Sequence, residues 1–174
     1  MAIYKKFNEI PQFTQSGNWQ SDFDLENLIR HIDSEVEKYG LNLNPDFQRG
    51  HVWTIEQEKA FIEYFLRGGR TGRDIYFNSP SWNFSVPEGE YDEYVCVDGL
   101  QRITAIRKFL NNEISAFGTY YRDFEDKIRT STHYMILHVN DLKSREEVIQ
   151  WYIDMNSGGT PHSEEEIERV RNLI

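Results

Sequence analysis

The sequence predicts an α+β fold, a small mixed sheet flanked by helices, in a single domain spanning residues 1–174. Three observations support it. Stretches with helical apolar spacing alternate with short apolar runs of strand length, turn residues separate the two, and no repeat is present. A chain of 174 residues is long enough to enclose one core and short for two. Residues 1–20 lack a clear pattern, so we expect them to form a peripheral segment.

Local start and stop signals place the helices. Two capping boxes, Thr54 with Gln57 and Ser144 with Glu147, each begin a run with helical apolar spacing. The expected helices are 23–39 (between Asp22 as N-cap and Gly40 as stop), one from Thr54 to the glycines at 68–69, one after Asp98-Gly99, a short one over 123–129, one from Ser144, and a last one capped by Ser163 with Glu166.

Short apolar runs between turn residues predict the strands. We expect strands over 75–78, 94–97 and 134–139, a hairpin over 113–122 around Gly118, and an exposed loop over 79–93. Cys96 is the single cysteine and lies within the second of these runs, which predicts a buried thiol and excludes an internal disulfide.

Charge and hydropathy limit the function classes. The net charge is −10, and tight non-specific DNA binding depends on Lys and Arg side chains that neutralise phosphates. Any contact with DNA would therefore use a local patch or a partner subunit. No segment has the ~20 apolar residues of a membrane span, and residues 1–10 lack the apolar core of a signal peptide. We expect a cytoplasmic protein.

The segment Asp98-Gly99-Leu100-Gln101-Arg102 joins a strand to a helix. A glycine here permits a sharp turn, and the helix start presents unpaired N–H groups to an anion. Arg102 would add a charge-assisted contact, and Asp98 could hold a Mg²⁺ ion or brace the loop. The alternative is an ordinary Asp-Gly turn followed by a solvated arginine.

Two further loops carry polar groups beside glycines. In 44–53, Gln48 and Arg49 lie between Pro45 and Gly50, either as part of a phosphate site or as a plain connector to the next helix. In 156–160, Asn156 precedes Gly158 and Gly159, which form either a helix stop or a loop that closely approaches a ligand.

Together the three loops make the chain resemble the N-terminal domain of GmrSD-type, modification-dependent (type IV) restriction endonucleases, a ParB/sulfiredoxin-like family. The family's Asn-Pro-x-Phe-Gln-Arg-Gly-x-x-Trp pattern matches 44–53, its Asp-Gly-Gln-Gln-Arg pattern matches 98–102, and its Asn-x-Gly-Gly pattern matches 156–159. Order and spacing agree over roughly residues 20–174.

The resemblance implies binding and hydrolysis of a nucleoside triphosphate, coupled to cleavage of modified DNA. It assigns the nucleotide role, and with it catalysis, to Asp98, Gln101 and Arg102, with Gln48 and Arg49 in the same pocket. On the chemistry of the residues themselves we expect Mg²⁺ at Asp98, and we expect phosphate-binding residues at Gln48, Arg49, Gly99, Arg102, Asn156, Gly158 and Gly159.

Two departures weaken the functional expectation. Leu100 stands where the family has glutamine, so hydrolysis is less secure than binding. We find no counterpart of the family's His-Asn-His nuclease domain and no metal-ligand pattern among the histidines, so the chain alone should not cut DNA. Two alternatives stay open: a catalytically silent nucleotide sensor or partner-binding regulator of a restriction or anti-restriction complex, and a ParB-like kinase.

Overall fold

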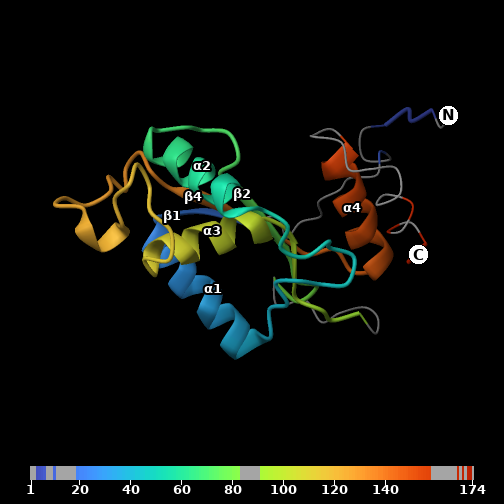
Figure 1. Cartoon of the computed structure of the whole chain (residues 1–174). Coiled ribbons are helices and arrows are strands. Elements are labelled where there is room, and N and C mark those ends of the chain that lie inside the picture. The colour runs from blue at the N-terminus through green and yellow to red at the C-terminus, as the bar shows by residue number, and fades with distance from the viewer. Residues whose placement is uncertain are drawn as a thin grey trace.

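The computed structural model describes residues 3–6, 10, 19–82, 91–157, 168, 170 and 172–173, and their arrangement confirms the α+β class (Figure 1). The elements are the strands β1 (Trp19–Phe23), β2 (Asp74–Asn78), β3 (Val95–Asp98) and β4 (Met135–Asn140), the helices α1 (Leu25–Tyr39), α2 (Ile55–Leu66), α3 (Leu100–Leu110) and α4 (Arg145–Ser157), and the 3-10 helix η2 (Tyr121–Asp123).

The four strands form one mixed sheet in the order β1-β4-β2-β3. β2 runs parallel to β4, whereas β1 with β4 and β2 with β3 are antiparallel. The register between β2 and β3 is irregular after Tyr76, which lies opposite Asp98, while Phe77 lies opposite Cys96. This irregularity occurs at the end of β3 where the Asp98-Gly99 turn begins.

Apolar side chains alternate between the two faces of the sheet, as the period of a strand requires. Ile75, Phe77 and Leu137 belong to the cluster that packs against α1, α2 and α3. Val95 and Val97 point the other way and belong to a second cluster with the apolar side of α4. Figure 1 shows α4 set apart from the other three helices.

Both capping boxes are present as predicted. The Thr54 hydroxyl accepts the N–H of Gln57 at 3.3 Å, and the Gln57 side chain accepts the N–H of Thr54 at 2.9 Å. At α4, Glu147 donates its N–H to the Ser144 hydroxyl at 3.2 Å. Gly40 ends α1 with a φ of 69°, as expected of a helix stop. The predicted last helix and its capping residues, Ser163 and Glu166, lie outside the described residues.

The start of the chain differs from the prediction. Trp19–Phe23 forms the edge strand β1, so Asp22 lies within a strand and the N-cap of α1 is Asp24, which accepts the N–H of Asn27 at 2.8 Å. β1 has only five residues, with apolar ones at its two ends, and its pairing partner is more than 100 residues away. Such a strand is specified by β4 rather than by a pattern of its own.

The hairpin predicted over 113–122, the helix over 123–129 and the loop over 79–93 can each be compared with the structure. The hairpin is confirmed as a tight turn, with Ala116 bridged to Thr119 and positive φ at Phe117 (51°) and Gly118 (81°). The helix expected over 123–129 is wrong: η2 ends at Asp123, and the residues that follow have no helical structure. Phe124 packs on Phe109 and Ile128 on the core from this irregular segment, so their burial does not require a helix. In the loop expected over 79–93, residues 79–80 are buried rather than exposed, and 83–90 lie outside the described residues.

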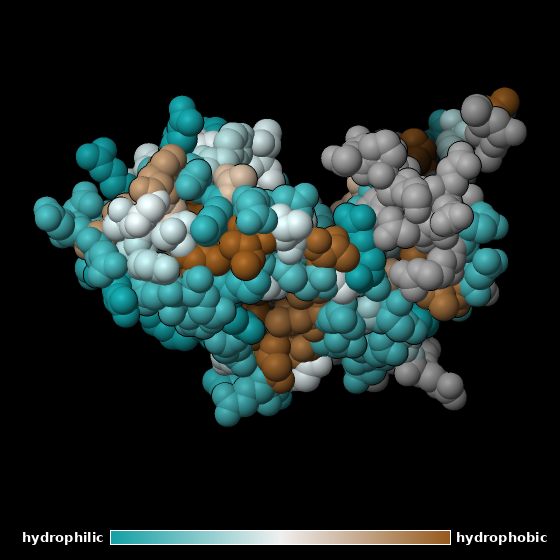
Figure 2. Space-filling model, in the orientation of Figure 1, coloured by the Kyte–Doolittle hydropathy of each residue, from teal (hydrophilic) through white to brown (hydrophobic). Residues whose placement is uncertain are grey.

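The surface is polar for the most part. Figure 2 shows a largely hydrophilic face on which apolar side chains appear in a few separate patches. Among the described residues, no helix combines the length and the apolar character that crossing a bilayer requires.

Candidate functional site

The Asp98-Gly99 turn brings the start of α3 against the sheet. Gly99 has a φ of 125°, a region that residues with a side chain rarely adopt. A Cβ atom at this position would lie 3.0 Å from both Cγ atoms of Ile75 in β2. Backbone conformation and close packing therefore both require glycine here.

The N-terminus of α3 has no side-chain cap. Its N-cap residue is Gly99, and the first i to i−4 bond runs from the N–H of Ile103 to the carbonyl of Gly99 at 2.9 Å. The N–H groups of the first turn and the positive end of the helix dipole suit an anion. Asp98 and Gln101 flank this helix start in the sequence, as predicted.

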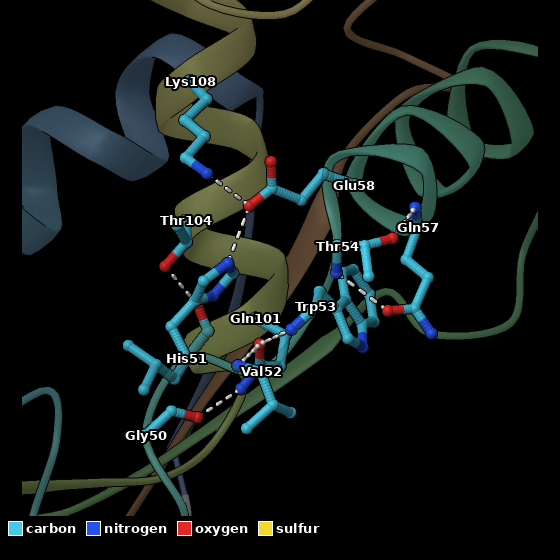
Figure 3. Close-up of polar contacts among 11 residues, drawn as sticks. Gly50, His51, Val52, Trp53, Thr54, Gln57, Glu58, Gln101, Thr104 and Lys108 are labelled. Carbon is cyan, nitrogen blue, oxygen red and sulfur yellow. Dashed lines mark hydrogen bonds and ion pairs between the residues drawn. The ribbon is translucent and has the colours of Figure 1, made fainter.

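Gln101 acts as a clamp on the loop that precedes α2 (Figure 3). Its Oε1 accepts the N–H groups of Val52 (2.9 Å) and Trp53 (3.1 Å), and its Nε2 donates to the carbonyl of Gly50 at 2.6 Å. The side chain proposed from the sequence to contact the nucleotide is thus committed to three backbone groups of loop 44–53.

A buried carboxylate holds the same loop from its other side. Glu58 in α2 is fully buried, and its Oε1 lies 2.7 Å from Nε2 of His51 and 2.6 Å from Nζ of Lys108 in α3 (Figure 3). Its Oε2 is also buried and makes no hydrogen bond within the described part of the chain. Loop 50–53 is therefore fixed between α2 and α3 by this triad as well as by Gln101.

The first half of the loop is anchored to β3 and α4. The Nε2 of Gln48 donates to the carbonyl of Cys96, and Phe47 is fully buried against α4, with its ring 5.4 Å from that of Tyr152. Arg145 contacts both carboxylate oxygens of Asp46 at 2.7 Å, which lowers the pKa of Asp46. Gln48, like Gln101, has a positioning role in this structure.

Loop 44–53 and the start of α3 converge on one small pocket of about 50 Å³, and the first residue of the third segment also lines it. Asn156 at the end of α4 lies there with loop 44–53 and the start of α3, and its Nδ2 donates to the carbonyl of Tyr152 at 2.7 Å. The lining residues are Gln48, Arg49, Gly50, Val97, Asp98, Leu100, Gln101, Tyr152 and Asn156. Gly158 and Gly159 lie outside the described residues.

The two predicted phosphate-binding arginines lie differently relative to Asp98. Arg102 donates from Nη2 to Asp98 Oδ2 at 2.7 Å, whereas Arg49, which is exposed, lines the same pocket as Asp98. The Nε of Arg102 is buried and makes no hydrogen bond among the described residues. Arg102 is not among the described residues that line the pocket, and its ion pair with the lining residue Asp98 connects it to the pocket.

The donor set fits a magnesium ion in one way only. Within the described residues, no three His, Cys, Asp or Glu side chains are grouped as metal ligands. Of the described residues that line the pocket, Asp98 is the one with a carboxylate, and its side chain is 41% exposed. Mg²⁺ often binds proteins through one carboxylate, water and substrate phosphates, and Asp98 could serve in that arrangement.

Sequence reasoning missed a polar row across the sheet beside Asp98. His138 in β4 contacts Asp74 in β2 through Nε2 at 2.8 Å, and its ring stacks on Tyr76 with 4.5 Å between centroids. Tyr76 in turn lies opposite Asp98. No local signal could have revealed the row, because the register between β2 and β4 creates it. The contacts of His138 with Asp74 and Tyr76 are those of a structural residue.

The comparisons with known proteins bear on these motifs. The model of the family described as "GmrSD restriction endonuclease, N-terminal domain" matches residues 25–172. The chain belongs to this family. The match includes loop 44–53, the Asp98–Arg102 segment and Asn156, and it confirms the family resemblance noted in the sequence. Searches of curated proteins and of solved structures gave no match.

The structure shows how the three motif segments of this family are arranged relative to one another. This GmrSD N-terminal domain brings all three of its described motif segments to one place, with α3 starting at the centre. Two of the motif side chains, Gln48 and Gln101, hold the backbone of this arrangement, while Arg49, Asp98 and Asn156 line the opening.

Proposed function

We propose that this GmrSD N-terminal domain binds the phosphate chain of a nucleoside triphosphate at the start of α3 and hydrolyses it as part of a DNA restriction system. The observation that carries the proposal is the convergence of loop 44–53 and Asn156 on an uncapped helix N-terminus, where Arg49 and Asp98 line one pocket and Arg102 pairs with Asp98. Phosphoryl transfer requires chiefly positioning and charge neutralisation, which such an arrangement can supply.

The size of the pocket limits how the ligand would lie. At about 50 Å³ it is far below the roughly 300–1,000 Å³ of typical ligand sites. We therefore place only a terminal phosphate at the N–H groups of Leu100 and Gln101, with the remaining nucleotide outside, past the exposed side chain of Arg49. No base preference follows from this placement.

In the nucleotide-bound state, Mg²⁺ would compete with Arg102 for the carboxylate of Asp98. Asp98 and Arg102 neutralise each other in this structure. A magnesium ion on Asp98 would supply positive charge to the phosphate oxygens, and it would leave the guanidinium of Arg102 available to a phosphate through a bidentate contact. The buried Nε of Arg102, which lacks a partner among the described residues, supports this reassignment.

Binding is tested by calorimetry with ATP, GTP and CTP in the presence of Mg²⁺, and turnover by phosphate release. Arg102→Ala should abolish binding. Arg107→Ala is the matched control, because it lies on the same helix and pairs with Asp33 at the surface, away from the pocket. An absence of heat with every nucleotide, or equal binding by both variants, would refute the proposal.

A catalytically silent sensor or regulator is the second candidate, and two observations favour it. Leu100 replaces a polar residue of the motif, and the Gln101 side chain is occupied by the loop backbone instead of facing a water site. Nucleotide binding without phosphate release would support this reading. The ParB/sulfiredoxin-like relationship stays a prediction, and with it the kinase alternative, which labelled product analysis separates from hydrolysis.

The net charge of −10 disfavours tight DNA binding by this chain alone. We propose that a separate nuclease domain or subunit supplies it, and that this chain contributes the nucleotide-dependent step. DNA binding by the isolated chain should be weak at physiological salt, since few cations are available for counterion release.

A further inference from the structure

A second and larger cavity, of about 650 Å³, lies at the opposite end of β3 from Asp98. It forms between the C-terminal part of α1, the turn after β2 and the residues that precede β3. Its lining consists of Glu35, Tyr39, Ser79, Ser81, Trp82, Asp92 and Tyr94. None of these residues belongs to the pocket at the start of α3, and the length of β3 separates the two by about 10 Å.

The cavity has aromatic walls that the fold holds in place. The ring of Trp82 packs against Tyr94 at 6.2 Å and against Trp19 of β1 at 5.4 Å between centroids. The turn that carries Trp82 is closed by its N–H bond to the carbonyl of Ser79 at 3.1 Å. Ser79 in turn donates its N–H to Asn140 of β4 at 2.9 Å.

Lys143 fixes the same turn from outside the cavity. Its Nζ donates to the carbonyl of Pro80 at 2.6 Å, and it lies 3.4 Å from Asp141. The aromatic wall is therefore part of the folded framework. A ligand would meet a surface that is already ordered, which lowers the entropy lost on binding.

The charged side chains that line the cavity are negative among the residues that the structure describes. They are Glu35 and Asp92, and no described Lys, Arg or His lines the cavity. Glu35 is only 7% exposed, and its one ion-pair neighbour among the described residues is His31, 3.9 Å from Nδ1 to Oε1. A buried carboxylate usually needs a close, hydrogen-bonded cation, and 3.9 Å is too long for such a bond.

Tyr94 forms an uncharged part of the same wall beside Glu35. It is 7% exposed. Burial first, and then the negative charge of Glu35 and a hydrogen bond with the Glu35 side chain, raise the pKa of Tyr94 above its ordinary value, so the phenol stays neutral. Its ring therefore contributes an aromatic surface to the cavity, while the negative charge stays on the Glu35 carboxylate.

We propose that this cavity binds a small organic cation of the alkylammonium class. Aromatic faces attract such cations through their quadrupoles, and the buried carboxylate of Glu35 and the exposed one of Asp92 balance the charge of the cation. The same charges disfavour phosphates and nucleotides, so this site is distinct from the one at the start of α3. The proposal does not depend on nucleotide binding.

Choline and its neutral isostere 3,3-dimethylbutan-1-ol are the probes, and the indole N–H resonances of the four tryptophans report where they bind. Trp82→Phe identifies the Trp82 resonance. Choline should shift this resonance with saturation, and the neutral isostere should not. Equal shifts with both probes, or no shift at Trp82 up to the highest soluble choline concentration, would overturn the proposal.

Charge variants complete the test. Glu35→Gln should weaken choline binding roughly tenfold or more, whereas Glu37→Gln, an exposed position on the same helix, should bind as the unaltered chain does. Circular dichroism verifies that each variant is folded. If Glu35→Gln is not folded, Asp92→Asn replaces it, with a several-fold weaker affinity expected. If the cavity variant and the Glu37→Gln control bind choline with equal affinity, the assignment of this cavity as a cation site is refuted.

Discussion

Gln101 and Gly50 lie 51 positions apart, yet the side-chain amide of the first donates to the carbonyl of the second at 2.6 Å. The same side chain accepts the N–H groups of residues 52 and 53. The side chain of Gln101 therefore bonds the backbone of loop 50–53 in the way that a neighbouring strand would bond a β-strand. It joins the second residue of α3 to the segment that carries Arg49, so the geometry of the two motifs is coupled.

Gln101→Ala should lower the free energy of unfolding by about 1–2 kcal/mol, because it leaves three backbone groups without their partner. Gln101→Glu should lower the free energy of unfolding by less, since a carboxylate still accepts hydrogen bonds from the N–H groups of Val52 and Trp53. Urea unfolding measures both. Gln150→Ala is the control, because that side chain bonds only Asp154 at the exposed surface of α4. Equal stability of Gln101→Ala and the control would show that the clamp contributes nothing.

Gly99→Ala should be more destabilising than an ordinary helix-end substitution. The φ of 125° costs an alanine on the order of 1–3 kcal/mol, and its Cβ would in addition contact Ile75 at 3.0 Å. Gly40→Ala isolates the backbone cost, because φ is 69° there and no atom lies within 4 Å. In an Ile75→Ala background the effect of Gly99→Ala should shrink towards that of Gly40→Ala. Thermal unfolding of the four variants decides this, and an unchanged effect would exclude the contact.

The Glu58 triad should show coupling between its two donors. His51→Gln and Lys108→Met each leave Glu58 Oε1 with one of its two charged partners. The double variant removes both partners from a fully buried carboxylate. The loss of stability in the double variant should exceed the sum of the single losses by about 0.5–3 kcal/mol. Repeating the cycle with Glu58→Gln should remove most of the coupling. Additive losses in the original cycle would mean that the two donors act independently.

Cys96 should be inert in the folded chain. Burial raises the pKa of its thiol to about 12, with the neighbouring Asp98 charge adding to the shift, so the thiolate does not form near neutral pH. Iodoacetamide should modify the urea-unfolded chain at pH 8 and leave the native chain unmodified on the same timescale. Comparable rates in both states would contradict the burial of this thiol.

The same shift gives a pH dependence of stability. The folded pKa of Cys96 lies above the ordinary value of 9.0, so the stabilisation is complete below pH 9 and is lost as the pH rises towards about 12. Cys96→Ala should flatten this decline between pH 9 and 10. Urea midpoints of both chains measure it, and parallel declines would assign the pH effect to the tyrosines instead.

Local signals predicted much of the fold. Helix starts depend on a side chain and an N–H group three residues apart, so the Thr54–Gln57 and Ser144–Glu147 boxes could be identified directly from the sequence. The strand over 134–139 and the helix after Asp98-Gly99 were likewise predicted within one or two residues. The strand β1 could not be found this way, because its hydrogen bonds come from β4.

In the candidate site, too, local sequence predicted some features, and contacts between distant residues determined the others. The sequence identified the three segments, and the glycine at 99 could be predicted to adopt a positive φ from its place between strand and helix. It did not indicate that Gln48 and Gln101 bond to loop and strand backbone, or that Arg102 pairs with Asp98 at 2.7 Å. These roles depend on contacts between residues far apart in the chain, the Arg102–Asp98 pair excepted.

By itself, the sequence determined where helices start, which residue types carry charge and which family patterns are present, because each of these is a property of neighbouring residues. Only the tertiary structure decided which side of the sheet each segment joins and which side chains bond the backbone rather than face the pocket. A hydrogen bond 51 positions apart forms only after two helices and a sheet have packed, and no short stretch of sequence encodes that distance.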